Sequence, residues 1–348
     1  MTSANDAQKS EAPKTITFTD AYRIALEESM ALDESVIMLG EDIGDEEGGG
    51  VFKVTKGLST RFGRHRVRTT PISEEAIVGA AVGAALAGMR PVAEIMLMNF
   101  VTVAMDQIVN HAAKLRFMSG GQTSVPLTIR TRTGAGAGTA GQHSDMLEAW
   151  FAHVAGMKVV VPSSPADAIG LMAGCIFDDD PCLFIEDGMT RTLQGPAPPP
   201  NHRLPLGKAN VLRAGTDVSL ISYGRPIQDA KAIADKLAGE GISVEIVDLR
   251  TVSPLDTETV LKSVAKTRRA VIAHEAPRSF GVGAEVAARI QEHLFSDLKA
   301  PVLRVASRDV PVPFTKVLEQ EFLYKRTAME AAIRQTLDAK HSAARSAR

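Results

Sequence analysis

Two residues of this sequence have side chains and positions that could support acid–base chemistry, Glu74 and His143. Glu74 follows the stretch Thr70–Ser73 and opens a run rich in alanine and glycine, whereas His143 follows a glycine-rich stretch at 134–141. Each lies where a predicted strand gives way to a predicted helix, and open parallel sheets bind ligands at such turns. A carboxylate and an imidazole can both exchange protons near neutral pH when their surroundings tune them. We therefore treat both as candidate catalytic residues.

Each candidate also has a simpler explanation. Ser73 could cap the following helix, with Glu74 placed favourably at its positive end. Gly136, Gly138 and Gly141 match the spacing of a dinucleotide-binding fingerprint between a strand and a helix. That fingerprint also needs an acidic residue at the end of the next strand, and none is present there. An NAD-binding oxidoreductase is therefore the remote alternative.

A third candidate is the acidic turn of three aspartates at 178–180, which follows Cys175 and precedes Pro181. Aspartate oxygens could bind a cation, although such a run is more often a solvated turn at the end of a helix. The sequence contains no P-loop, no His-Glu-x-x-His zinc motif, no nucleophile elbow and no EF-hand loop. A Gly-Asp-Gly motif is also missing.

Short β-branched runs alternate with longer helical patterns along the chain, which predicts the α/β class with two mostly parallel sheets covered on both faces. The predicted strands of the first half are Val36–Leu39, Pro91–Ile95, Val125–Ile129, Lys158–Val161 and Cys182–Ile185. The predicted helices between them are Asp20–Leu32, Glu75–Gly88, Phe100–Met118, Ser144–Val154 and Ala166–Phe177. A second, smaller series follows, with strands Val218–Ile221, Val244–Val247, Ala270–Ala273 and Val302–Val305.

The domain boundaries follow from composition. A proline-rich segment at 191–206 predicts an extended linker that cannot pair in a sheet, because five prolines lie within it. It separates a first domain, 15–190, from a second domain, 207–338, and we expect disordered tails at 1–14 and 339–348. The alanine and glycine helix after Glu74, with Gly79 and Gly83 one turn apart, predicts a tightly buried helix, which would suit a subunit interface.

Composition limits the function classes. The chain has 348 residues, which suits about two domains. Its net charge of −2 does not suggest a nucleic-acid-binding protein, and its two cysteines exclude a disulfide scaffold. No apolar stretch is long enough to span a membrane, and the N-terminus resembles neither a signal nor a transit peptide. These features predict a cytoplasmic protein.

Several motifs in order resemble the beta subunit of the decarboxylating first component of 2-oxo acid dehydrogenase complexes, over roughly residues 15 to 338. The matching stretches are Leu39–Asp42, Thr70–Glu74, Met98–Phe100, Met105–Ile108, Met118–Gly121, Gln142–Ser144, Asp248–Thr251, Pro254–Asp256 and Gly281–Glu285. The resemblance implies a pyrimidine-binding domain like that of transketolase, followed by a domain like the transketolase C-terminal domain. It also implies dependence on thiamine diphosphate.

The resemblance gives roles to individual residues. Glu74 matches the glutamate that hydrogen-bonds the aminopyrimidine ring of thiamine diphosphate, and His143 matches a histidine that manages protons during acyl transfer to lipoamide. Phe100 matches an aromatic residue that packs on the pyrimidine, and Glu41 and Ile72 match residues that line the same pocket. The positions of a monovalent cation site, usually for potassium, match Leu127, Cys175, Asp178 and Asp180.

The resemblance also implies partners. In this family a separate alpha subunit carries the Gly-Asp-Gly motif and binds the diphosphate through Mg²⁺, so the chain is expected to be inactive alone. The expected assembly is an α2β2 heterotetramer that docks to a lipoyl-bearing acyltransferase core. The length argues against a single-chain transketolase or deoxyxylulose-phosphate synthase. Pyruvate is the most generic substrate, acetoin and branched-chain 2-oxo acids stay open, and a non-catalytic scaffold is a further alternative.

Overall fold

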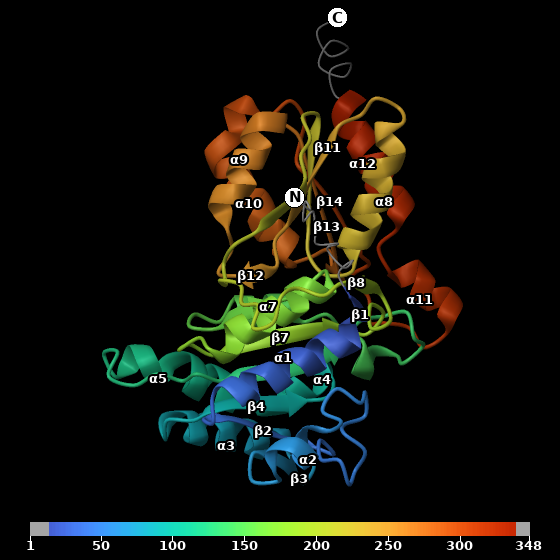
Figure 1. The fold of residues 1–348 in the computed structure, drawn as a ribbon. Coiled ribbons are helices and arrows are strands. Elements are labelled where there is room, and N and C mark those ends of the chain that lie inside the picture. The colour runs from blue at the N-terminus through green and yellow to red at the C-terminus, as the bar shows by residue number, and fades with distance from the viewer. Residues whose placement is uncertain (1–13, 339–348) are drawn as a thin grey trace, which may run out of the picture.

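In the computed structural model, residues 14–338 are described, so the predicted tails lie outside this part of the chain except for Lys14. The described part forms two α/β units stacked one above the other (Figure 1). This is the class expected from the alternation of strands and helices.

The first unit is built on a seven-stranded sheet with the order β12-β6-β7-β5-β4-β2-β3. All neighbouring strands run parallel except β12, which is antiparallel to β6. The strands are β2 (Val36–Glu41), β3 (Val67–Thr70), β4 (Arg90–Ile95), β5 (Thr128–Thr133), β6 (Lys158–Val160), β7 (Cys182–Asp187) and β12 (Thr251–Ser253).

Helices cover both faces of this sheet, because side chains alternate between its faces. Val36 and Met38 of β2 pack into one core, and Ile37 and Leu39 pack into another. The first core contains residues of α1 (Phe18–Leu32), α2 (Leu58–Phe62) and α7 (Pro165–Ile176). The opposite core contains residues of α3 (Glu74–Leu86), α4 (Met98–Val101), the 3-10 helix η1 (Thr102–Ala104), the π-helix η2 (Gln107–Ala112), α5 (Ala113–Met118) and α6 (Glu148–Ala152).

The second unit has a five-stranded sheet with the order β14-β13-β10-β11-β9, parallel except for β9. Its strands are β9 (Asn210–Arg213), β10 (Val218–Ser222), β11 (Val244–Asp248), β13 (Ala270–Pro277) and β14 (Leu303–Ser307). On one face lie α8 (Pro226–Ala238) and α12 (Arg326–Asp338), and on the other lie α9 (Thr257–Thr267) and α10 (Val282–Leu294), followed by η4 (Phe295–Asp297) (Figure 1). The short α11 (Lys316–Phe322) stands apart, at the level where the two units meet (Figure 1).

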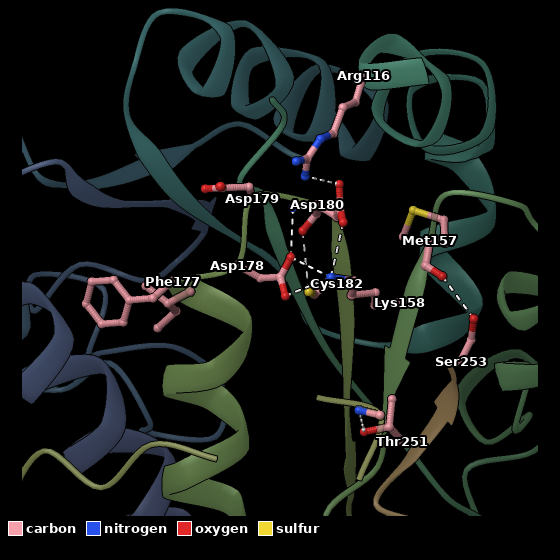
Figure 2. A network of polar contacts seen from close by, with 12 residues as sticks. Arg116, Met157, Lys158, Phe177, Asp178, Asp179, Asp180, Cys182, Thr251 and Ser253 are labelled. Atoms are coloured by element: carbon pink, nitrogen blue, oxygen red, sulfur yellow. Dashed lines mark hydrogen bonds and ion pairs between the residues drawn. The ribbon is translucent and has the colours of Figure 1, made fainter. Parts of the chain in front are cut away.

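The two units share one hydrophobic core. The cluster that holds Ile77 and Ile129 of the first unit continues through Tyr223 and Val247 to Val286 in the second. The strand β12 follows β11 along the chain but pairs with β6 of the first sheet, and Ser253 Oγ donates a hydrogen bond to the Met157 carbonyl (3.0 Å; Figure 2). The second domain therefore contributes an edge strand to the first.

Two local expectations about strands and helices were wrong. The linker does pair in part, because β8 (Gln194–Pro196) is antiparallel to β1 (Thr15–Thr17), and Pro196 is tolerated on this two-stranded edge. The expected continuous helix over 100–118 is instead a series of α, 3-10 and π segments.

The helix α3 was expected to be tightly buried and to suit a subunit interface. Within this chain, it is covered on one side only. Gly79 lies against the Gln107 side chain, where a Cβ atom would come within 3.2 Å of its Oε1. A Cβ atom at Gly83 would meet no other atom within 4 Å, and Ala80 and Ala87 are exposed. The small-residue face beyond η2 is thus open within this chain.

No helix in the range 14–338 is both long enough and apolar enough to cross a lipid bilayer.

Candidate functional site

Five predicted site residues come together along one edge of the first sheet. Glu41 ends β2, Ile72 and Glu74 follow β3, Phe100 lies just after β4, and His143 follows β5. The strands β5, β4, β2 and β3 are consecutive neighbours in the sheet, and they run parallel. Their carboxyl ends therefore meet at the same edge, which is where open parallel sheets bind ligands.

Glu41 and Glu74 form a pair of interacting carboxylates at this edge. Partial burial raises the pKa of Glu41, and the neighbouring charges of Asp42 and Glu74 raise it further. Glu74 is the first residue of α3, where the positive end of the helix favours a carboxylate. The expected cap by Ser73 is wrong, because its side chain makes no capping hydrogen bond. Glu74 is half-buried and accessible from the edge.

Apolar side chains lie at the same edge of the sheet as these carboxylates. Ile72 is 74% exposed, which is unusual for a large aliphatic side chain, and Phe100 is half-buried. The Phe100 ring lies edge-on to the imidazole of His143, with the ring centroids 5.4 Å apart and the planes at 75°. A carboxylate between an aliphatic and an aromatic side chain can hold a flat, nitrogen-bearing heterocycle by one hydrogen bond and two apolar contacts.

His143 is exposed and ends the 3-10 turn η3 (Gly141–His143). Asn99, next to Phe100, fixes this turn: its Nδ2 donates to the Gly141 carbonyl and to Asp145 Oδ2, both at 2.8 Å. Its Oδ1 accepts from the Asp145 main-chain N–H at 3.2 Å. The histidine therefore stands in a turn that is tied to the start of α4. Asn99 was not singled out in the sequence, although it lies within the Met98–Phe100 motif.

The glycine-rich stretch before His143 is held by the second domain. Gly136 N–H donates to Glu319 Oε1 at 2.7 Å, and Gly138 N–H donates to Glu319 Oε2 at 3.0 Å. Ala135 N–H donates to Glu275 Oε1 at 2.8 Å. Nothing local in the sequence indicated Glu275 or Glu319, because both reach the loop across the domain boundary.

These contacts also weigh against the dinucleotide alternative. Such a fingerprint uses free main-chain amides at the start of a helix to bind a pyrophosphate. Here the amides of Gly136 and Gly138 are already bonded to a carboxylate, and the element that follows is only the three-residue turn η3.

The predicted cation residues lie far from this edge, at the opposite ends of β5 and β7 and at the end of α7. Lys158 Nζ lies between two aspartates, 2.7 Å from Asp178 Oδ1 and 3.1 Å from Asp180 Oδ2, and Arg116 lies 2.6 Å from Asp180 Oδ1 (Figure 2). Although burial opposes ionisation, the hydrogen bonds from Arg116 and Lys158 lower the pKa of Asp180.

Main-chain carbonyl groups around this turn also take part in hydrogen bonds. The Leu127 carbonyl accepts from Cys182 N–H, and the Cys175 carbonyl accepts from Asp178 N–H. Between residues 14 and 338, no group of three or more histidine, cysteine or acidic side chains is arranged to hold a metal ion. A potassium ion at this turn would thus be bound by main-chain oxygens, because the aspartate side chains are paired with cations of the chain itself.

Comparison with known families gives two matches that together cover most of the chain. The model of the transketolase pyrimidine binding domain matches residues 14–189, and the model of the transketolase C-terminal domain matches residues 207–329. Among solved structures, a split gene transketolase, described as an inactive beta4 tetramer, superposes with a TM-score of 0.75. It covers 93% of this chain and 99% of that chain at 23% identity, and so shows the fold.

Curated relatives are more similar in sequence. The beta subunit of acetoin:2,6-dichlorophenolindophenol oxidoreductase from Cupriavidus necator is 44% identical, covering 91% of this chain and 96% of the relative. The 2-oxoisovalerate dehydrogenase subunit beta of Bacillus subtilis is 41% identical, covering 92% of this chain and 98% of the relative. The pyruvate dehydrogenase E1 component subunit beta of Staphylococcus epidermidis is 42% identical, covering 91% of this chain and 97% of the relative. The chain therefore belongs to the transketolase-like, thiamine-diphosphate-dependent family that includes the beta subunits of the first components of 2-oxo acid dehydrogenase complexes.

Proposed function

We propose that the chain supplies the pyrimidine-binding half of a thiamine-diphosphate site in a 2-oxo acid dehydrogenase first component. The reaction would be the oxidative decarboxylation of a 2-oxo acid, with transfer of the acyl group to lipoamide. The observation that carries this proposal is the convergence of Glu41, Glu74, Phe100 and His143 at one sheet edge.

The residues at this edge suit an aminopyrimidine ring. Glu74 would hold a ring nitrogen by a hydrogen bond and share a proton with it, while Phe100 and Ile72 would contact the two faces of the ring. When bound, thiamine diphosphate supplies a thiazolium ring that acts as the electron sink for loss of CO₂. His143 would hold or release the proton needed when the acyl group leaves for lipoamide, and proton transfer by a positioned group typically contributes about 10²–10⁴-fold.

The site is open in a manner that suits a partner subunit. Ile72 is largely exposed, and beyond Glu75 the exposed face of α3 near Glu74 carries the small residues Ala76, Ala80 and Gly83. Ala80 and Ala84 also line a surface hollow of about 830 Å³ together with Phe62 and His65. We propose that an alpha subunit covers this region and binds the diphosphate through Mg²⁺, in an α2β2 heterotetramer.

The three curated relatives are named for acetoin, 2-oxoisovalerate and pyruvate chemistry. Pyruvate is the most generic proposal for this chain, with acetoin and branched-chain 2-oxo acids as the alternatives. Docking to a lipoyl-bearing acyltransferase core and a cytoplasmic location belong to the same proposal. The potassium site near Leu127, Cys175, Asp178 and Asp180 stays a prediction.

Reconstitution tests the proposal directly. The chain is expressed alone and together with an alpha subunit of the same organism that carries a Gly-Asp-Gly motif. Each preparation is assayed with thiamine diphosphate and Mg²⁺ on pyruvate, 2-oxoisovalerate and acetoin. We expect turnover of one substrate by the co-purified complex and none by the chain alone. Turnover by the isolated chain would overturn the need for a partner, and an intact complex that is inactive on all three would favour a scaffold. Heat released on titration with NAD would revive the dinucleotide alternative.

A further inference from the structure

One buried carboxylate of the second domain holds the loop that carries His143. Glu319 belongs to α11 and is 1% exposed. Its two oxygens accept from two different main-chain amides of the glycine-rich loop, Gly136 N–H at 2.7 Å and Gly138 N–H at 3.0 Å. An ionised carboxylate that bridges two such N–H groups makes strong, geometrically defined hydrogen bonds.

Only a special backbone can present these amides together. Gly136 has φ = 125° and Gly138 has φ = 75°, and these positive angles suit glycine. Successive N–H groups of such a backbone form a concave, anion-binding surface. The loop 134–141 is thus shaped as a receptor for the Glu319 carboxylate, and without the carboxylate its amides would lack their partners.

A second group of contacts from the same domain supports this arrangement. Ala135 is fully buried in a small apolar cluster with Val312 and Phe322, which flank α11 or end it. Its N–H donates to Glu275, and its carbonyl accepts from Arg225 Nη1 at 2.9 Å. The loop is therefore fixed at its start by packing and at its centre by Glu319.

The far end of the loop determines where the imidazole lies. Thr139 and Ser144 are joined through their hydroxyl groups at 2.7 Å, and Asn99 holds the Gly141 carbonyl. His143 lies between these two ties, with its ring edge-on to Phe100. Gly138, which bonds Glu319, is five residues before His143, so a shift of the loop at Gly138 would move the imidazole relative to Phe100.

We propose that Glu319 is a positioning residue for the reaction: it sets His143 against the cofactor-binding edge and couples the second domain to acyl transfer. This inference rests on the proposed function of His143. Glu319 lies in the second domain and touches the main-chain amides of the loop, so it acts through the loop and not on the substrate. Its loss should therefore affect the step that uses His143 more than the step that uses Glu74.

The test uses the reconstituted complex of full-length chains with Glu319→Gln. Glutamine keeps the size of the side chain but places an NH₂ group against one of the two amides, which leaves a buried donor without an acceptor. Glu321→Gln is the matched control, because Glu321 lies in the same helix, is 59% exposed and pairs only with Arg308 and Lys325. Glu319→Asp, which keeps the charge on a shorter side chain, is measured in parallel in case the glutamine variant does not fold.

Two assays separate the steps. Reduction of 2,6-dichlorophenolindophenol reports turnover without lipoamide, and acylation of a lipoyl domain reports acyl transfer. We expect Glu319→Gln to leave the rate of dye reduction within about threefold of the unmodified complex and to lower the rate of acyl transfer by about 10- to 100-fold. Glu321→Gln should change neither rate. Combined with His143→Ala, Glu319→Gln should cause no further loss of acyl transfer, because both remove the same function. Equal losses in both assays, or additive losses in the double variant, would show a merely structural role and overturn the inference.

Amide hydrogen exchange measures the protection of the loop amides without any enzymatic turnover. In the unmodified complex Gly136 and Gly138 should exchange slowly, and in Glu319→Gln or Glu319→Asp faster exchange should be confined to residues 134–143. Fast exchange of these amides in the unmodified complex, or unchanged exchange in both variants, would contradict the inference. If the unmodified complex turns over no substrate, the proposed function fails, and the exchange data still decide whether Glu319 holds the loop.

Discussion

At the scale of single residues, the candidate site contains two carboxylates, Glu41 and Glu74, whose charges interact. Burial and the charges of Asp42 and Glu74 raise the pKa of Glu41. Glu41 therefore keeps its proton to a higher pH than an exposed glutamate does. Two neighbouring acids with different environments can take different roles in proton transfer.

Glu74→Gln should lower turnover of the reconstituted complex by about 100-fold or more, because glutamine cannot share a proton with a ring nitrogen. Glu75→Gln is the control, since Glu75 is the next residue in the same helical turn and is exposed. We expect the control to stay within about threefold of the unmodified complex in the same initial-rate assay. Activity of Glu74→Gln close to that of the control would eliminate the proposed role.

At the scale of elements, the turn that carries His143 is stabilised in part by the segment that follows the neighbouring strand of the sheet. The loop between β5 and α6 has only the short 3-10 turn η3 as regular structure. Asn99, at the start of α4, ties this turn to the end of β4 by three hydrogen bonds to Gly141 and Asp145. The segment after β4 thus provides both Phe100, the proposed cofactor contact, and Asn99, which supports the turn that carries the histidine.

Asn99→Ala removes all three hydrogen bonds and should lower the free energy of unfolding by about 2 kcal/mol. It should also lower acyl transfer more than dye reduction, because the imidazole loses one of its ties. Asn110→Ala is the control, since Asn110 is exposed and bonds only Asp106 and Lys114. Thermal unfolding and the two assays check this prediction, and equal effects of both variants would show that the ties to Gly141 and Asp145 contribute nothing specific.

At the scale of the whole molecule, the second domain is joined to the first by strand pairing, a shared core and buried polar contacts. Asp248, at the end of β11, accepts hydrogen bonds from the Ser163 hydroxyl of the first domain and from the Arg250 main-chain N–H (3.1 Å). Arg250 in turn bonds Asp167 of α7 at 2.5 Å. The motif Asp248–Thr251, recognised as a family pattern, thus serves as a junction between domains.

This junction predicts a pH dependence of stability. Burial raises the pKa of Asp248 from 3.8 to about 7. Between these values the folded protein keeps a proton that the unfolded chain loses, so this group favours the folded state at low pH and the benefit is lost as pH rises through 7. We expect the unfolding free energy to fall by about 2 kcal/mol from pH 5 to pH 8 through this group alone.

Asp248→Asn should remove that part of the decline, because asparagine accepts from Arg250 without titrating. The measurement is thermal unfolding of the chain and its variant at pH 5 and pH 8. Asp235→Asn is the control, because Asp235 is an exposed residue of α8 that pairs with Arg213 on the surface. If Asp248→Asn and the control show the same decline between the two pH values, Asp248 does not titrate as its burial indicates.

The α/β class and the position of most parallel strands follow from the sequence alone, which also leads to Glu74 and His143 as candidate catalytic residues. Buried strands give unbroken apolar runs, and the ends of parallel strands share one edge, so local patterns suffice for these features. It also led to Glu41, Ile72 and Phe100 through the resemblance to a known family. The strands β1, β8, β9 and β12 were not expected, because each has only three or four residues and none is a continuous apolar run.

The strand order that places β5, β4, β2 and β3 side by side is visible only in the folded chain. The same is true of the crossing of β12 to the first sheet and of the contact between Glu319 and an amide 183 residues earlier in the chain. A side chain in a short helix carries no local sign of such a partner. Contacts over long sequence separation arise from the packing of whole elements, and local sequence periodicity does not encode which elements will meet.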